Sequence, residues 1–106
     1  MAHVMFRARY TQSGIQGLLK EGAEGRVKAL SDLTASIGGR METCYWSFGD
    51  DDFLMIAEVP SNAAAAALAT RVSASGAASV STTVLLTAAE VDEARGIGVN
   101  YRAPGS

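Results

Sequence analysis

The spacing of the apolar residues changes along this chain in the order strand, helix, strand, strand, helix, strand. Val4, Phe6 and Ala8 alternate with polar or larger residues, which predicts a first strand over residues 3–10. Over residues 23–37 the apolar residues recur at spacings of three and four, which predicts a helix with one buried face. Glycines follow directly at 38 and 39, and glycine readily adopts the left-handed backbone of a helix end.

A β-hairpin is predicted over residues 40–59. Residues 40–48 are rich in β-forming side chains, and strict alternation places Met41, Thr43 and Tyr45 on one face, opposite Glu42, Cys44 and Trp46. Residues 49–52 (Gly-Asp-Asp-Asp) form the turn, and residues 53–59 form the next strand. Four consecutive apolar residues at 54–57 indicate a central strand that is covered on both faces.

The remaining segments complete the pattern. Ser61 or Asn62 caps a predicted helix over residues 63–72, and a last strand is expected at 80–86. Thr87 and Glu90 have capping-box spacing, which predicts a short helix that ends near Arg95. Residues 11–25 contain four glycines, so we expect no continuous helix there, and at most one helical turn at 18–20.

This order, βαββαβ, is typical of an α+β ferredoxin-like fold with a four-stranded antiparallel sheet. Two helices cover only one face of such a sheet. The other face carries Met5 and apolar residues of the second and third strands, and it is too apolar to be left in water. We therefore expect a homodimer in which two sheets meet face to face and form an α/β barrel.

Length and composition exclude several classes of protein. The 106 residues fit one domain, expected at 1–99, with a loose tail at 100–106. Nine basic residues and a net charge of −2 leave no basic face for nucleic acid. One cysteine permits no intrachain disulfide. No apolar run is long enough to span a membrane and no leader sequence is seen, so a cytoplasmic location is expected.

Several short motifs resemble those of one known family, the GYD-domain family. Tyr-Thr-x-x-Gly at 10–14 follows the first strand, and Gly-Gly at 38–39 precedes the second. The hairpin at 45–52 and the Glu-Val-Pro exit at 58–60 are similar to the family's signature segment. Asp51 stands where the family has its signature tyrosine. The resemblance covers about residues 4–95.

The resemblance implies a fold and an assembly more than an activity. The family is similar to dimeric α/β-barrel proteins, which include cofactor-independent monooxygenases, muconolactone-type isomerases, dehydratases and stress-response proteins. The GYD family itself has no generally assigned activity. A small dimeric protein that binds an apolar or aromatic metabolite is the first expectation. The alternative is a cofactor-independent isomerase, cyclase or monooxygenase that acts on an aromatic or polyketide-like substrate.

Charged residues of the first and third predicted strands supply the candidates for acid–base chemistry. Arg7 shares a strand face with Met5, where its guanidinium binds an anionic ligand, pairs with Glu42 or Glu58, or lies in solvent at the sheet edge. Glu58 lies late in an otherwise apolar strand, so it is either a base or the partner of an arginine. His3, the only histidine, is either a strand-end residue or an acid or base.

Aromatic residues around the hairpin supply the candidates for ligand binding. Such side chains either belong to the core and dimer interface or line an apolar cavity between sheet and helices. The predicted catalytic candidates are His3, Arg7, Tyr45 and Glu58. The predicted ligand-binding residues are Arg7, Tyr45, Trp46, Phe53 and Glu58.

No cofactor or metal site is predicted. The carboxylates at 50–52 suit a solvated turn better than a cation site, and Asp52 is expected to cap backbone amides of the hairpin. Cys44 is interpreted as a buried small apolar residue rather than a nucleophile. The glycines at 14–25 match no phosphate-binding pattern.

Overall fold

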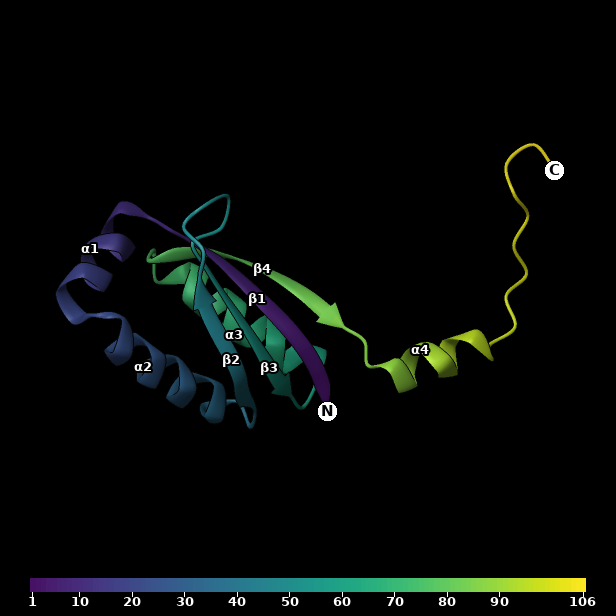
Figure 1. Ribbon diagram of the computed structural model, residues 1–106, viewed down its shortest axis with the longest axis horizontal. Coiled ribbons are helices and arrows are strands. Elements are labelled where there is room, and N and C mark those ends of the chain that lie inside the picture. The colour runs from purple at the N-terminus through teal and green to yellow at the C-terminus, as the bar shows by residue number, and fades with distance from the viewer.

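The computed structural model describes all 106 residues and contains one sheet and four helices. Figure 1 shows their arrangement. In chain order the elements are β1 (Ala2–Tyr10), α1 (Gln12–Glu21), α2 (Ala23–Ser36), β2 (Arg40–Trp46), β3 (Phe53–Val59), α3 (Asn62–Ala74), β4 (Ala78–Leu85) and α4 (Ala88–Arg95). The strands are antiparallel in the order β2-β3-β1-β4. This is the predicted α+β ferredoxin-like architecture, with α1 and α4 as additions.

The core lies between one face of the sheet and the two helices α2 and α3. Alternate residues of β1 and β3 are buried there, because successive side chains of a strand point to opposite faces. Leu30 and Leu33 of α2 pack on this layer from one side, and Leu68 of α3 packs from the other. The fully or nearly buried apolar residues are Val4, Phe6, Phe53, Met55, Ala57, Val59, Ala65, Leu68 and Ala78.

The segment before α2 is a helix, so the expectation of at most one helical turn there was wrong. Thr11 caps α1 by accepting a hydrogen bond from the Gly14 amide. A Cβ on Gly14 would lie 1.9 Å from the carbonyl oxygen of Ala77. Gly22, with φ of +89°, ends α1. Two of these glycines therefore serve close packing and helix termination, which outweighs their low helix propensity.

A β-bulge between Met41 and Thr43 interrupts the pairing of β2 with β3. Strict alternation placed Met41 opposite Cys44 and Trp46, and this was wrong. All three pack against the core, because the extra residue changes the phase of the strand. That residue is Glu42, and its carboxylate reaches His3 on the other face of the sheet.

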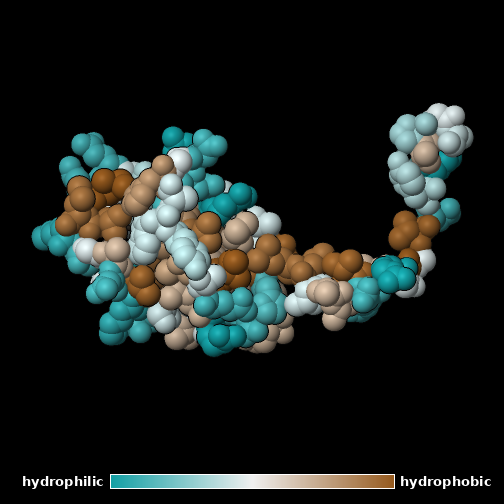
Figure 2. All heavy atoms as spheres, viewed as in Figure 1, coloured by the Kyte–Doolittle hydropathy of each residue, from teal (hydrophilic) through white to brown (hydrophobic).

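The last helix lies apart from the sheet. α4 begins with the predicted capping box of Thr87 and Glu90 and has no buried residue. It continues away from the end of β4, and the molecule is 57 Å long as a result (Figure 1). Figure 2 shows hydrophobic atoms along the stretch that joins the body of the molecule to its extended end. Leu86, which lies between β4 and α4, is exposed. No helix of the chain combines the length and the apolar character needed to cross a membrane.

Candidate functional site

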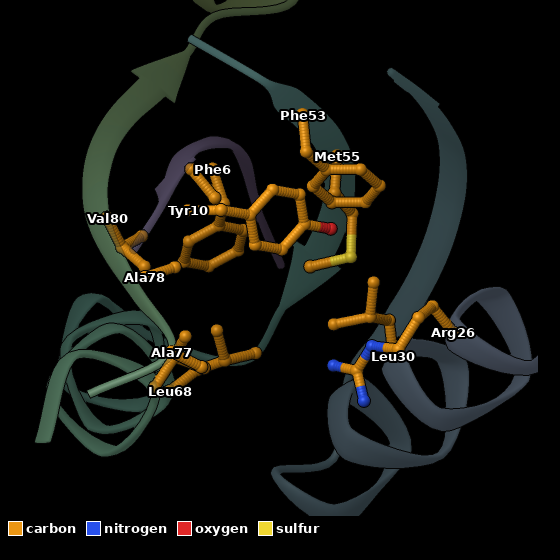
Figure 3. A pocket seen from close by; sticks show the side chains of 12 residues that line it. Phe6, Tyr10, Arg26, Leu30, Phe53, Met55, Leu68, Ala77, Ala78 and Val80 are labelled. Carbon is orange, nitrogen blue, oxygen red and sulfur yellow. The ribbon is translucent and has the colours of Figure 1, made fainter. Parts of the chain in front are cut away.

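A pocket opens between the sheet and the two helices that cover it. It has a volume of about 60 Å³ and is lined by twelve residues, of which eleven are hydrophobic. Figure 3 shows Phe6, Tyr10 and Phe53 of the sheet on one side, and Leu30 and Leu68 of the helices facing them. The other lining residues are Ala8, Arg26, Met55, Val72, Ala77, Ala78 and Val80.

The pocket has a polar rim. A second hollow of about 260 Å³ adjoins it and shares Tyr10, Arg26 and Ala77 with it. The Arg26 guanidinium points into the space between the two helices (Figure 3). The nearest acidic group to it is the Glu21 carboxylate, 3.7 Å from Nη1 to Oε1, and both side chains are partly exposed. A loosely paired cation thus stands beside an apolar pocket, a combination that suits an amphipathic ligand.

Tyr10 is fixed at the pocket by two hydrogen bonds. Its backbone amide donates to Asp52 Oδ2 at 2.9 Å, and its phenol oxygen accepts from Trp46 Nε1 at 3.1 Å. The Trp46 ring packs edge-on against Phe53, with ring centroids 4.9 Å apart. The turn at 49–52 therefore helps to position one wall of the pocket. Asp52 caps a backbone amide as expected, although the amide belongs to the end of β1 rather than to the hairpin.

The predicted site residues lie on two different faces of the sheet. Trp46 and Phe53 belong to the helix-covered side, and Phe53 lines the pocket. Tyr45 lies on the open face and is 65% exposed. The charged candidates also lie on the open face, where Glu58 is opposite His3 and Leu54 is opposite Arg7 in the β1–β3 register. The structure therefore does not bring all the predicted residues into one site.

A separate cluster forms at one end of the open face. His3 Nδ1 lies 2.9 Å from Glu42 Oε1, and His3 Nε2 lies 3.7 Å from Glu58 Oε1. The other Glu58 oxygen lies 3.2 Å from Nη2 of Arg40 and accepts its hydrogen bond. The His3, Glu42 and Glu58 side chains are 26%, 30% and 28% exposed.

Arg7 is not paired with a glutamate, so the predicted partners Glu42 and Glu58 were wrong. Both glutamates contact His3 instead. The carboxylate nearest to Arg7 is that of Asp51, 3.9 Å from Nε to Oδ2. The Arg7 Nε atom is buried and makes no hydrogen bond within the protein.

The turn carboxylates and the lone cysteine have structural surroundings. The Asp51 carboxylate lies near Arg7, and the Asp52 carboxylate accepts a hydrogen bond from the Tyr10 backbone amide. The three consecutive aspartates therefore do not converge on one cation position. Cys44 is half-buried against the core, in agreement with its interpretation as an apolar residue. Burial raises the pKa of the Cys44 thiol, which keeps it protonated and weakly nucleophilic.

Three residues of the pocket and of the open-face cluster were not predicted as site residues: Tyr10, Arg26 and Glu42. Arg26 lies four residues before Leu30, and that spacing places it beside the apolar stripe of its helix. Tyr10 belongs to the alternating set of β1 that forms the core face. Both signals were present in the sequence. Glu42 was considered only as a partner of Arg7, because nothing local marks the bulge beside which it reaches His3.

The comparison with protein families agrees with the motifs and the fold. No curated protein and no solved structure gives a significant match to the chain. The model of the GYD domain matches residues 5–94, which is most of the sequence and includes β2, β3, β4 and most of β1. The hairpin, the Gly-Gly segment and the Glu-Val-Pro exit that suggested this family all fall within that range. The chain belongs to the GYD domain family.

Proposed function

We propose that this GYD domain protein is a small-molecule-binding protein, and that its ligand is a small apolar or aromatic metabolite held between the sheet and α2 and α3. The observation that carries the proposal is the hydrophobic pocket of about 60 Å³ together with the adjoining hollow of about 260 Å³, since the pocket alone is too small for an aromatic ring. The apolar part of a ligand would replace water against Phe6, Phe53 and Leu68. Burial of apolar surface is worth about 25 cal/mol per Å².

The chemistry of the pocket wall favours binding over the enzymatic alternative. General acid–base catalysis needs a titratable group within hydrogen-bonding reach of the substrate. None of the four catalytic candidates, His3, Arg7, Tyr45 and Glu58, is among the lining residues. The polar groups at the rim are the Arg26 guanidinium and the Tyr10 phenol, the one acid–base group in the wall, whose oxygen already accepts a hydrogen bond from Trp46; both suit recognition of a ligand's polar end.

We further propose that the protein acts as a homodimer joined through the open face of its sheet. The centre of that face carries Met5 beside Ile56, with Leu54 one row further on. All three are only half-buried in the single chain. Arg7 and the cluster at His3 flank them. An apolar centre with a polar rim is the usual anatomy of a protein–protein interface, and a second copy offers the same surface in return.

A pair of valine variants on β4 tests the pocket. Val80 lines it, whereas Val84 lies on the same strand outside it. A panel of small aromatic and aliphatic carboxylates, with their neutral analogues, is first screened by thermal shift. When the concentration of a bound compound is well above its Kd, the rise in melting temperature is proportional to the logarithm of that concentration divided by Kd.

Val80→Phe should fill the pocket and abolish the ligand-induced shift, while Val84→Phe should preserve it. Each variant's own melting temperature shows whether it is folded. A panel in which no compound raises the melting temperature would contradict the proposal. So would an active compound whose effect is the same on both valine variants.

A further inference from the structure

The cluster of His3, Glu42 and Glu58 is used by neither the pocket nor the core. Three different strands contribute to it: β1, β2 and β3. The donor atoms of its three side chains all lie within 4.8 Å of one another. Glu42 is the extra residue of the β-bulge in β2 and reaches His3, although regular alternation with Cys44 and Trp46 would point it to the helix side. Bulges often redirect a side chain next to a functional site.

We propose that His3, Glu42 and Glu58 form a binding site for a first-row divalent transition metal ion, with Zn²⁺ as the representative case. The inference does not depend on the pocket or on its ligand. One imidazole and two carboxylates supply the nitrogen and oxygen donors that Zn²⁺, Co²⁺ and Mn²⁺ accept. The imidazole disfavours Ca²⁺ and Mg²⁺, which prefer oxygen donors.

The distances support a shared ion. Two ligands that each lie about 2.1 Å from a metal, at tetrahedral or octahedral angles, are about 3.0–3.4 Å apart. The 2.9 Å separation of His3 Nδ1 and Glu42 Oε1 is close to that edge length. Glu58 Oε1 lies 3.7 Å from the other ring nitrogen, and one ion binds only one nitrogen of a ring, so the proposal requires the Glu58 carboxylate to move to the Nδ1 side. That movement is short, since one donor atom from each side chain lies within 4.8 Å of the others.

The surroundings of the cluster suit a bound cation. Two carboxylates face a single imidazole, which leaves net negative charge on the donor set when the imidazole is neutral. Arg40 hydrogen-bonds the outer oxygen of Glu58 and leaves its inner oxygen directed at His3. Such an outer partner fixes the orientation of a metal ligand. All three side chains are about two-thirds or more buried, so they are partly preorganised.

The test is zinc binding by the tag-free, metal-stripped protein, measured by competition with a chromogenic chelator near pH 7. The expected result is one Zn²⁺ per chain. Because His3 is the only histidine, His3→Gln should lower the affinity at least 100-fold. Glu42→Gln and Glu58→Gln should each lower it at least tenfold. Asp50→Asn, which removes an exposed carboxylate in the hairpin, should leave the affinity within twofold.

Two further variants separate this site from other metal-binding groups of the chain. Cys44→Ala should leave zinc affinity unchanged, since Cys44 packs on the opposite face. An N-terminal extension of a few residues should also leave it unchanged, which excludes chelation by the α-amino group together with His3. The absorption spectrum with Co²⁺ should indicate nitrogen and oxygen ligands without thiolate charge transfer.

Melting temperatures without metal show that the variants are folded. Zn²⁺ should raise the melting temperature of the wild type but not that of folded His3→Gln. Failure of the wild-type protein to bind one zinc ion per chain would overturn the proposal. Equal affinities of the wild type and His3→Gln would overturn it as well.

Discussion

The side chain of Asp52 joins the turn at 49–52 to the end of β1 through the Tyr10 amide. Asp52→Ala would leave that part-buried N–H without a partner, and the expected loss of stability is about 1–3 kcal/mol. Asp52→Asn should lose less, because its side-chain carbonyl can accept the same bond. Urea denaturation of both variants measures the difference.

The neighbouring Asp50 is the control for this prediction. It is exposed and its side chain forms no hydrogen bond or ion pair within the protein, so Asp50→Ala should change the free energy of unfolding by no more than about 0.5 kcal/mol. Equal losses in Asp50→Ala and Asp52→Ala would show that the charge of the turn, rather than the bond to Tyr10, sets its stability.

Individual residues of the candidate sites were predictable where local pattern governs them. Phe53 was expected either in the core or dimer interface or at an apolar cavity, and it lies in the core and also lines the pocket. His3 and Glu58 were singled out separately, but their proximity depends on the register of β1 with β3. Glu42 was not predicted because a bulge depends on pairing between strands rather than on sequence spacing. Long-range register is the information that residue patterns lack.

Within α1, two glycines are predicted to respond in opposite ways to the same substitution. Gly14→Ala forces a Cβ against the Ala77 carbonyl and should lower the free energy of unfolding by about 1–3 kcal/mol or more. At Gly17 nothing lies within 4 Å of the added Cβ. Gly17→Ala should therefore stabilise the helix by roughly 0.5–1 kcal/mol. Chemical denaturation of the two variants measures both changes, and a similar loss in both would contradict this account.

The same helix explains the limit of prediction at the level of elements. Strands and helices with strong apolar periodicity, such as α2 and β3, were predicted with nearly their observed bounds. α1 was missed because its glycines were counted only by propensity. Their roles in a close approach and a helix end become visible only when the Ala77 loop packs against them.

The capping box of α4 makes that helix sensitive to acid. Hydrogen bonds from the Thr87 backbone and hydroxyl hold the pKa of the Glu90 carboxyl below its usual range. A group whose pKa is lowered by folding stabilises the folded form above its unfolded pKa, and this contribution is lost as the pH falls through the folded pKa. Amide hydrogen exchange within α4, corrected for the intrinsic pH dependence of exchange, should therefore show lower protection factors below the usual titration range of a glutamate.

Glu90→Gln provides the comparison for this acid sensitivity. Its amide accepts a hydrogen bond but does not titrate in the acid range, so the step in α4 exchange should disappear in the variant. An identical acid response in Glu90→Gln and the wild type would assign the effect to another group.

At the scale of the whole molecule, the prediction concerns the open face of the sheet. Ile56→Arg places a charge between Met5 and Thr43 at its apolar centre. If two copies meet there, this variant should be monomeric at micromolar concentrations where the wild type is dimeric. Sedimentation equilibrium measures the mass of each. Buried charges without partners are costly at an interface.

Thr70→Arg is the matched control, since Thr70 is an exposed residue of α3 on the other side of the sheet. It should remain dimeric. A wild type that is monomeric throughout the micromolar range would contradict the face-to-face assembly. So would an Ile56→Arg variant that dimerises as well as Thr70→Arg.

The hydrogen bond between Trp46 and Tyr10 has a spectroscopic consequence. Trp46 is the only tryptophan in the chain, and its indole N–H donates to a phenol whose ring lines the pocket. Indole emission shifts in wavelength with the polarity and hydrogen bonding of its surroundings. A compound that enters the pocket and displaces Tyr10 should therefore change the fluorescence of the unlabelled protein, whereas zinc at the distant cluster on the open face should not. The molecule carries its own optical reporter of pocket occupancy.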